Sequence, residues 1–331
     1  MQRRDNHRPF PARAVATAVI AGVAILLAAT PWISGWIAAL DQLAPAWPLA
    51  PVLAIGALVL ARGRGPAAIG AIGALALCIP TILVQPVPNS APQAGLRLRV
   101  VTHNVWTRNV DPVGTAAVLA GSGADILLLQ ETAGQFASAL PMLARSFPYT
   151  SRCQRRRCAV TILSRYPIEQ VGHRSPDRLW RRIDPGVMLE VHVRLPGDAG
   201  TIAVVTVHLA RGQPPGADLN QRTALAQALR RADGESLILA GDFNLVPWSA
   251  RMRALEESLD PLVRGTATLS WPARVGERSS SLPLVSIDHV FAGTGWAVAG
   301  VYRLSRTGSD HYPIAVDLIW QGRGAMVTTG R

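Results

Sequence analysis

The sequence has few cysteines, no lysine and little aromatic content. Three cysteines among 331 residues are too few for a cysteine-rich zinc site. All 33 basic residues are arginine, which reflects composition and excludes no function by itself. Against 21 acidic residues they give a net charge of +12, which suits a polyanion or anionic head groups, although a solvated arginine-rich surface explains it too. The chain also lacks a Gly-x-Ser-x-Gly nucleophile elbow and a glycine-rich phosphate loop.

Charge is also absent from three long apolar stretches near the N-terminus, at residues 14–40, 42–61 and 65–96. Crossing a hydrocarbon core takes about 20 apolar residues of helix, so each stretch has room for one span. We therefore predict three transmembrane helices near residues 15–38, 45–61 and 66–85. Pro48 and Pro51 shorten the uninterrupted helical part of the second.

Arginines set the expected orientation of these helices. Those before the first stretch are Arg3, Arg4, Arg8 and Arg13. They would also suit a cleaved signal peptide, but two further apolar stretches follow at once, which favours a membrane-embedded hairpin. Arg62 and Arg64 lie between the second and third stretches, while the loop near Asp41 has no basic residue. The positive-inside rule then predicts a multi-pass protein of the cell (inner) membrane, with everything after about residue 86 outside the cytoplasm.

A cysteine pair falls in this external part of the chain. Cys153 and Cys158 bracket the segment "CQRRRC", and outside the cytoplasm they could close a small disulfide loop. Two free thiols without a role are the alternative, and the residues leave both open. Cys78 lies in a predicted span, where it would act as a small apolar filler.

Composition divides the chain into a membrane region at 1–85, a Pro-rich linker at 86–96, a soluble domain at 97–320 and a Gly-rich tail at 321–331 that we expect to be disordered. Asp111 and Pro112 predict the start of a helix, and further helices are expected near 134–146 and 218–232. The expected strands lie near 96–100, 126–129, 159–168, 186–195, 201–208, 237–240, 284–292, 296–304 and 312–320. Several are apolar on both faces, which indicates an α/β fold with helices covering the sheets.

Polar side chains recur where these strands end. They are Asn104, Glu131, His208, Asp242, Asn244, Asp288, Asp310 and His311. Taken singly, each is more often a cap, a turn residue or a satisfied histidine. Together they predict one cleft outside the strand ends, and their oxygen atoms are hard ligands suited to Mg²⁺ or Mn²⁺. In "GDFN", residues two apart on an extended chain face the same way, so Asp242 and Asn244 should enter the cleft while Phe243 packs beneath.

The motifs "HNVW", "LLLQE", "ILSRYPI", "VHL", "GDFN", "IDHVF" and "SDHYP" occur in an order that resembles the endonuclease/exonuclease/phosphatase superfamily. The resemblance covers about residues 97–320. It implies a fold like that of pancreatic deoxyribonuclease: a four-layer sandwich of two mixed β-sheets flanked by helices. That superfamily contains nucleases, sphingomyelinases, inositol-phosphate phosphatases and deadenylases, so it indicates the reaction better than the substrate.

The resemblance also implies roles for the polar residues. Glu131 looks like the main metal carboxylate, Asn104 like a support for the metal or phosphate, and Asp310 like a further acid of the metal site.

The resemblance assigns the remaining residues to the reaction itself. Asp242 resembles the residue that orients or deprotonates the attacking water, and Asn244 resembles a phosphate or water binder. His311, held by Asp288, resembles the histidine on the scissile phosphate. His208 corresponds to a position near the leaving oxygen.

These observations predict a membrane-anchored, Mg²⁺- or Mn²⁺-dependent phosphoester hydrolase acting on nucleic acid. The alternatives are the same chemistry on a phospholipid or sphingolipid head group, and a non-catalytic binding module. Arg155, Arg156 and Arg157, next to Arg152, could contact either a nucleic-acid backbone or anionic lipid heads. No protein partner is indicated.

Overall fold

The computed structural model describes residues 12–83, 94–152, 159–172, 188–197, 200–211, 219–230, 232–276, 278–280 and 282–322. The chain forms two compact units. The first consists of Met1–Gln85 with Trp248–Ala250, and the second consists of Pro86–Pro247 with Arg251–Arg331. Each unit is described by itself.

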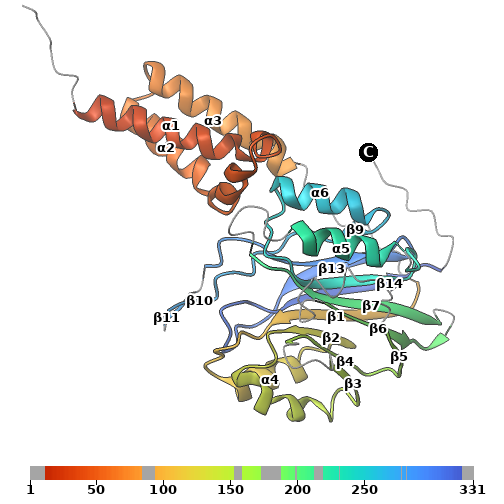
Figure 1. The fold of residues 1–331 in the computed structure, drawn as a ribbon. Coiled ribbons are helices and arrows are strands. Elements are labelled where there is room, and N and C mark those ends of the chain that lie inside the picture. The colour runs from red at the N-terminus through yellow and green to blue at the C-terminus, as the bar shows by residue number, and fades with distance from the viewer. Residues whose placement is uncertain are drawn as a thin grey trace, which may run out of the picture. The chain divides into compact units, whose positions relative to one another are not determined.

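The first unit is helical (Figure 1). Its elements are α1 (Ala12–Ile33), the 3₁₀ segment η1 (Ala38–Ala46), α2 (Leu49–Ala61) and α3 (Pro66–Leu83). The helices pack through small side chains, and the buried set includes Ala24, Ala28, Ala50, Ala54, Ala57, Ala71 and Ala74. Large apolar side chains point outward instead, among them Val19, Val52, Ile55, Val59, Ile69 and Ile72. Helices that face water have the opposite arrangement, with large apolar side chains inside and polar ones outside.

The prediction of three spanning helices is wrong as to their number. Among the described helices, only α1, with 22 residues, is by itself long and apolar enough to cross a membrane. A second candidate exists only if the pair Ala39–Ala46 and Leu49–Ala61, which is bent by 72°, counts as one span. The bend falls beside Pro48, and α3, with 18 residues, falls short of the roughly 20 apolar residues that a span typically takes.

The second unit contains two six-stranded sheets. Sheet A has the order β13-β14-β1-β2-β4-β3, and sheet B has the order β5-β6-β7-β8-β12-β9. The strands of sheet A are β1 (Arg97–Asn104), β2 (Ile126–Gln130), β3 (Tyr149–Arg152), β4 (Thr161–Ser164), β13 (Trp296–Arg303) and β14 (Ile314–Trp320). Those of sheet B are β5 (Ile168–Gly172), β6 (Met188–Arg194), β7 (Thr201–His208), β8 (Ile238–Asp242), β9 (Val263–Arg264) and β12 (Asp288–Ala292). Each sheet is mixed, because β1 pairs in parallel with β2 and β7 with β8, whereas the other pairs are antiparallel.

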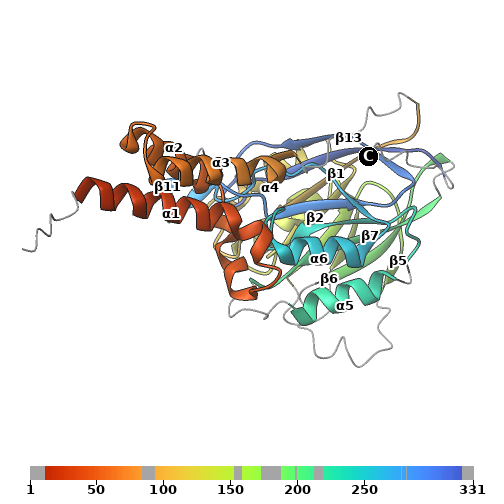
Figure 2. The ribbon, with the colours of Figure 1, turned by 90° about the horizontal axis from the view of Figure 1, so that it is seen from above.

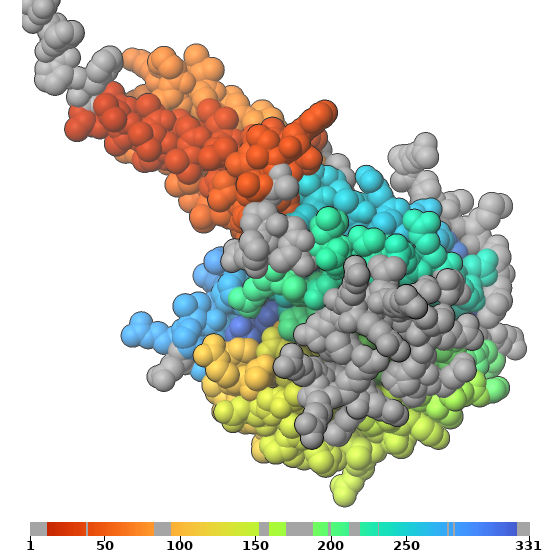
Figure 3. Space-filling model, viewed as in Figure 1, coloured from red at the N-terminus to blue at the C-terminus, as the bar shows by residue number. Residues whose placement is uncertain are grey.

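The two sheets pack face to face on an apolar core that includes Leu98, Leu128, Val191 and Val204. Helices α5 (Leu219–Leu229) and α6 (Ala250–Leu259) cover the outer face of sheet B, and Figures 1, 2 and 3 show them side by side. The outer face of sheet A is covered by α4 (Pro112–Ala120), η2 (Gln135–Ser138) and η3 (Leu140–Leu143). The predicted α/β sandwich of two mixed sheets flanked by helices is confirmed.

Most of the local predictions match the structure. Asp111 is the N-cap of α4 and accepts a hydrogen bond from Gly114 N at 2.9 Å. The expected antiparallel pair at 186–195 and 201–208 is β6 and β7. The single helix expected at 134–146 is wrong, because Pro141 has no N–H to donate and the segment forms the short turns η2 and η3 instead. Helix α6 and the hairpin of β10 (Arg274–Val275) and β11 (Arg278–Ser279) were not predicted.

Candidate active site

Polar side chains from both sheets meet at one edge of the sandwich. The parallel strands β1 and β2 of sheet A, and β7 and β8 of sheet B, all deliver their polar residues at their C-terminal ends. Asp288, however, is the first residue of β12. Because β12 runs antiparallel to β8, Asp288 pairs with Asp242 at the end of β8. His311 likewise precedes β14, which is antiparallel to β1. The expectation that every site residue follows a strand is therefore wrong for these last positions, where the start of an antiparallel strand reaches the same edge.

Asn104 connects the two sheets at the centre of the site. Its amide Nδ2 donates to Glu131 Oε1 at 2.9 Å and to Asp242 Oδ2 at 3.0 Å. Its Oδ1 accepts from Trp106 N at 2.9 Å. Asn104 thus turns its donor toward the two carboxylates and holds them in place.

Glu131 is fixed from two sides. Thr107 donates to its Oε2 from the backbone N at 2.7 Å and from Oγ1 at 2.6 Å, while Asn104 binds Oε1. Partial burial raises the pKa of Glu131, but the hydrogen bonds from Thr107 and Asn104 outweigh it, so the pKa lies below the ordinary value. The side chain is therefore a carboxylate at neutral pH.

The two histidines flank Asp242. His208 Nε2 lies 3.6 Å from Asp242 Oδ2 and 3.8 Å from Glu131 Oε1. His311 Nε2 lies 3.8 Å from Asp242 Oδ2, and its Nδ1 lies 2.8 Å from Asp288 Oδ2. Burial lowers the pKa of His311, but the carboxylates of Asp288 and Asp242 outweigh burial and raise it to about 10. His311 is therefore an imidazolium at neutral pH, with an N–H on each side.

The site contains acidic oxygens that lack hydrogen-bond donors. Asp288 Oδ1 and Asp310 Oδ1 are buried and have no hydrogen-bond partner among the residues that the structure describes. Potential ligand atoms of Asp242, Asp288 and His311 lie within 4.8 Å of one another, but an imidazolium has no free lone pair for a metal, so only the carboxylates of this group could bind one. Buried carboxylates require compensating charge, and oxygen donors suit a divalent cation such as Mg²⁺ or Mn²⁺. The residues present therefore fit the predicted metal.

Asn244 lies at the site in a different conformation from the one predicted. Its φ is 51°, so the chain turns after Asp242 and is not extended there. Its backbone N donates to Asp242 Oδ1 at 2.9 Å. Its Nδ2 donates at 2.8 Å to the carbonyl oxygen of Leu209, the residue that follows His208. Phe243 is fully buried beneath, as predicted. Gly241 is required before this turn, because a Cβ there would lie 1.9 Å from Val207 O on the neighbouring strand.

Backbone strain is concentrated at this site. Trp106, Glu131 and Asn244 are three of the four described non-glycine residues with positive φ. Such conformations cost roughly 1–3 kcal/mol each and persist where function requires them. Sequence reasoning missed Trp106, which donates to Asn104, and Thr107, which donates to Glu131, because no local pattern marks either contact. It also missed Trp271, whose Nε1 lies 3.4 Å from Asp310 Oδ2.

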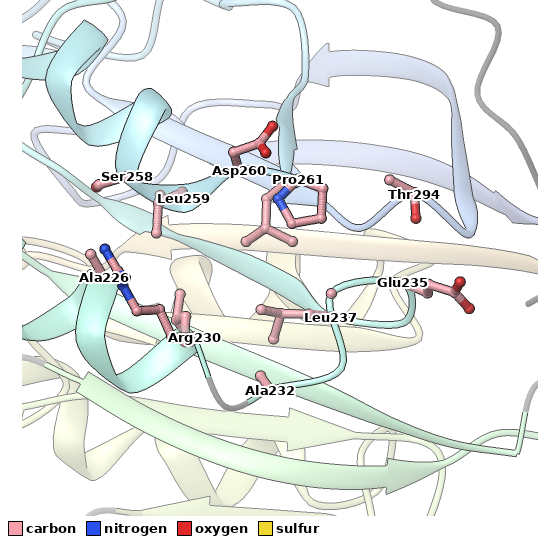
Figure 4. A pocket seen from close by; sticks show the side chains of 13 residues that line it. Ala226, Arg230, Ala232, Glu235, Leu237, Ser258, Leu259, Asp260, Pro261 and Thr294 are labelled. Carbon is pink, nitrogen blue, oxygen red and sulfur yellow. The ribbon is translucent and has the colours of Figure 1, made fainter. Parts of the chain in front are cut away.

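Several predicted residues cannot be placed here, and a pocket in the second unit lies elsewhere. Arg155, Arg156, Arg157, Cys153 and Cys158 lie outside the described residues. Cys78 is buried with a free thiol. A cavity of about 490 Å³ is lined by the ends of α5 and α6 and by Leu237 (Figure 4). Leu237 directly precedes β8, whereas the site residue Asp242 is at the opposite end of that strand. The cavity is therefore separate from the polar site.

Comparisons agree with this geometry. The sequence profile described as "Endonuclease/Exonuclease/phosphatase family" matches residues 101–311, more than half of the chain. No curated protein matches the chain. An endonuclease/exonuclease/phosphatase from Beutenbergia cavernae DSM 12333 has a similar structure, with a TM-score of 0.53 and 24% identity over 68% of this chain and 72% of that chain.

Two further solved structures share the fold. D. rerio TDP2, complexed with a single-strand DNA product, has a TM-score of 0.52 and 16% identity over 67% of this chain and 98% of its own. A mannosyl-6-phosphatase from Bacteroides thetaiotaomicron VPI-5482 has a TM-score of 0.51 and 17% identity over 67% of this chain and 100% of its own. At these identities the structures show the fold alone. By its sequence profile, the chain belongs to the endonuclease/exonuclease/phosphatase family of phosphoester hydrolases.

Proposed function

We propose that the protein is a membrane-anchored, Mg²⁺- or Mn²⁺-dependent phosphodiester hydrolase that acts on nucleic acid outside the cytoplasm. The observation that carries the chemistry is the contact of Asn104 with both Glu131 and Asp242, which joins the acids of the two sheets in one cluster. Family membership supports phosphoester hydrolysis as the reaction class.

The proposed mechanism divides the work among the residues of the site. A divalent cation, held by Glu131 and Asp310, would neutralise charge on the phosphoryl oxygens and the leaving group. Asp242 orients the attacking water and accepts its proton, because its Oδ2 lies 3.6 Å from His208 Nε2 and 3.8 Å from His311 Nε2, next to both histidines of the site.

The two histidines complete the mechanism. His311 donates from Nε2 to a phosphoryl oxygen while Asp288 holds its Nδ1–H. His208 Nε2, which lies 3.6 Å from Asp242 Oδ2, is the group next to the leaving oxygen.

The membrane anchor rests on the first unit. The large apolar side chains on the outside are suited to contact with lipid. Helices in a membrane pack through small residues, as the buried alanines do here. Helix α1 is a candidate span, and an N-terminal signal sequence passes the same test of length and composition. The arginines before α1 support a cytoplasmic N-terminus.

Positive charge near the site supports nucleic acid as the substrate. The guanidinium of Arg108 lies 5.2 Å from the centre of the Trp106 ring. Trp106 is two residues beyond Asn104 in the chain. Arg306 is exposed on the loop that leads to His311. Neither arginine forms an ion pair within the described part of the chain, so both are available to a backbone phosphate. Lipid head groups are the second candidate, favoured by the apolar exterior of the helices, which would keep the enzyme at a bilayer.

The test is a substrate panel with the full chain in detergent micelles, with Mg²⁺ or with chelator. DNA, RNA, sphingomyelin and phosphatidylinositides are compared, with Asp242→Asn as the inactive control. Hydrolysis of DNA or RNA that disappears with chelator supports the proposal. Hydrolysis of the lipids alone would transfer the assignment to the second candidate, and no hydrolysis of any phosphoester would overturn both.

A further inference from the structure

Three polar side chains lie buried between the sheets directly beneath the active site. They are Thr102 of β1, Gln130 of β2 and Thr206 of β7, and each is 0% exposed. Each lies one or two residues before a site residue on or directly after the same strand. Because residues two apart on a strand share a face, Thr102 lies under Asn104 and Thr206 under His208.

Gln130 connects this layer. Its Nε2 donates to Thr206 Oγ1 at 2.9 Å, to Leu128 O at 3.0 Å and to Thr102 Oγ1 at 3.2 Å. The bond to Thr206 passes from sheet A to sheet B. Gln130 Oε1 is buried and has no partner among the described residues.

Stability does not explain a glutamine at this position. The surrounding inter-sheet core is apolar and includes Leu128 and Val204. A buried amide with an unsatisfied oxygen costs free energy, whereas apolar side chains of the same shape would fill the space without that cost. A requirement of the site above is the remaining explanation.

That requirement is the relative placement of the two sheets. Glu131 comes from sheet A, while His208 and Asp242 come from sheet B, and the His208 Nε2 to Glu131 Oε1 distance is 3.8 Å. Apolar packing is non-directional, so it tolerates small sliding, whereas a hydrogen bond has a preferred length and angle. We infer that Gln130 is a positioning residue: its bond to Thr206 sets the spacing and register of the sheets at the site and so places Glu131 against His208 and Asp242. This inference rests on the proposed function.

The test replaces Gln130 by methionine in the full-length chain. Gln130→Met removes the amide at nearly constant volume but leaves the buried Thr206 Oγ1 and Thr102 Oγ1 without this donor, so the melting temperature should fall slightly while the domain still folds. A displacement of about 1 Å at a reacting group can cost about 10²-fold, so kcat should fall by at least about 10-fold with KM little changed. Binding of Mn²⁺, followed by calorimetry without substrate, should weaken several-fold, because Glu131 keeps its bonds to Thr107 and Asn104 but is no longer held at its spacing from Asp242 and His208 of the other sheet.

Thr206 provides the matched pair. Thr206→Val keeps the shape and loses the acceptor, so it should reproduce the loss in kcat. Thr206→Ser keeps the acceptor while losing a methyl group, so it should remain close to wild type. The double variant Gln130→Met with Thr206→Val should be little worse than either single change, because both remove the same bond.

Several outcomes would overturn the inference. Wild-type turnover and wild-type Mn²⁺ affinity in Gln130→Met would do so, as would equal losses in Thr206→Val and Thr206→Ser, or multiplicative losses in the double variant. If the wild type hydrolyses no phosphoester, the proposed function fails, while the Mn²⁺ affinities of the same variants still decide whether Gln130 positions Glu131.

Discussion

His311 Nδ1 lies 2.8 Å from Asp288 Oδ2, and neither side chain is more than 2% exposed. Asp310, the chain neighbour of His311, instead faces Trp271 through Oδ2. Both residues lie in the loop before β14, so turn geometry, and not the alternation of a strand, separates their directions. Asp288 is thus the acid in contact with the imidazole, and the resemblance implied this same pairing.

The His311–Asp288 pair should act as one unit in catalysis. His311→Ala should bind metal normally yet hydrolyse substrate about 10²–10⁴-fold more slowly, because a proton donor to the phosphate is lost. Asp288→Asn should reproduce the loss. Steady-state kinetics of the double variant should show little further decrease, since residues that act together are not additive. Independent, multiplicative losses would show that the pair does not work as a unit.

The carboxylates of the site should be needed for metal binding and for turnover. Glu131→Gln keeps the shape of the side chain and removes a negative charge from the metal site, so Mg²⁺ should bind more weakly. Asp242→Asn removes the proposed proton acceptor and should lower kcat by at least about 10²-fold. Circular dichroism should show that both variants fold. Full activity in either would refute the role assigned to that residue.

The raised pKa of His311 predicts how folding stability depends on pH. Its folded pKa of about 10 exceeds its ordinary 6.5, because the carboxylates of Asp288 and Asp242 outweigh burial. This contribution is fully present below pH 6.5, declines above it, and is lost as the pH rises through about 10. Denaturation in chelator should show the stability advantage of wild type over His311→Gln shrinking between about pH 6 and about pH 10. A constant difference would contradict the assignment of this charge.

The number of spans decides on which side the catalytic domain lies. With the N-terminus in the cytoplasm, one crossing places that domain outside, whereas a second crossing by the bent pair places it inside. A reporter fused after Gly95 should be active only outside the cytoplasm. A second fusion after Gly63, between α2 and α3, should agree with the first, since both sites are external with one span and cytoplasmic with two. Activity of a cytoplasm-only reporter at Gly95 would overturn the predicted localisation.

The linkage of Cys153 and Cys158 remains a prediction, because neither residue is among those described. If the domain is external, the pair should be joined, which requires Cα atoms within about 7 Å. Mass spectrometry of the non-reduced protein should find the linked peptide, with Cys78 as the internal free-thiol control. Replacing both residues with serine should then lower the melting temperature. Two free thiols at these positions would rule the loop out.

Much of the site could be predicted because its signals are local. An apolar run followed by an acid, as in Ile126 to Glu131, indicates a buried strand with a polar exit wherever it occurs. The cap of α4 is equally local, since Asp111 and Gly114 are three residues apart. The α/β class and the identities of the site residues were therefore accessible from the order of residues along the chain.

The contacts that make these residues a site depend on pairings across the whole domain. Asn104 and Asp242 are 138 positions apart, and Gln130 and Thr206 are 76 positions apart. Periodicity tells which face a side chain takes but not which strand lies opposite, so it could not reveal that β12 and β14 enter the site antiparallel. The sequence alone therefore determined the α/β class and pointed to the polar residues that the fold gathers into one site. Only the tertiary structure decided how they meet, because sheet pairing and sheet packing join segments that no local pattern connects.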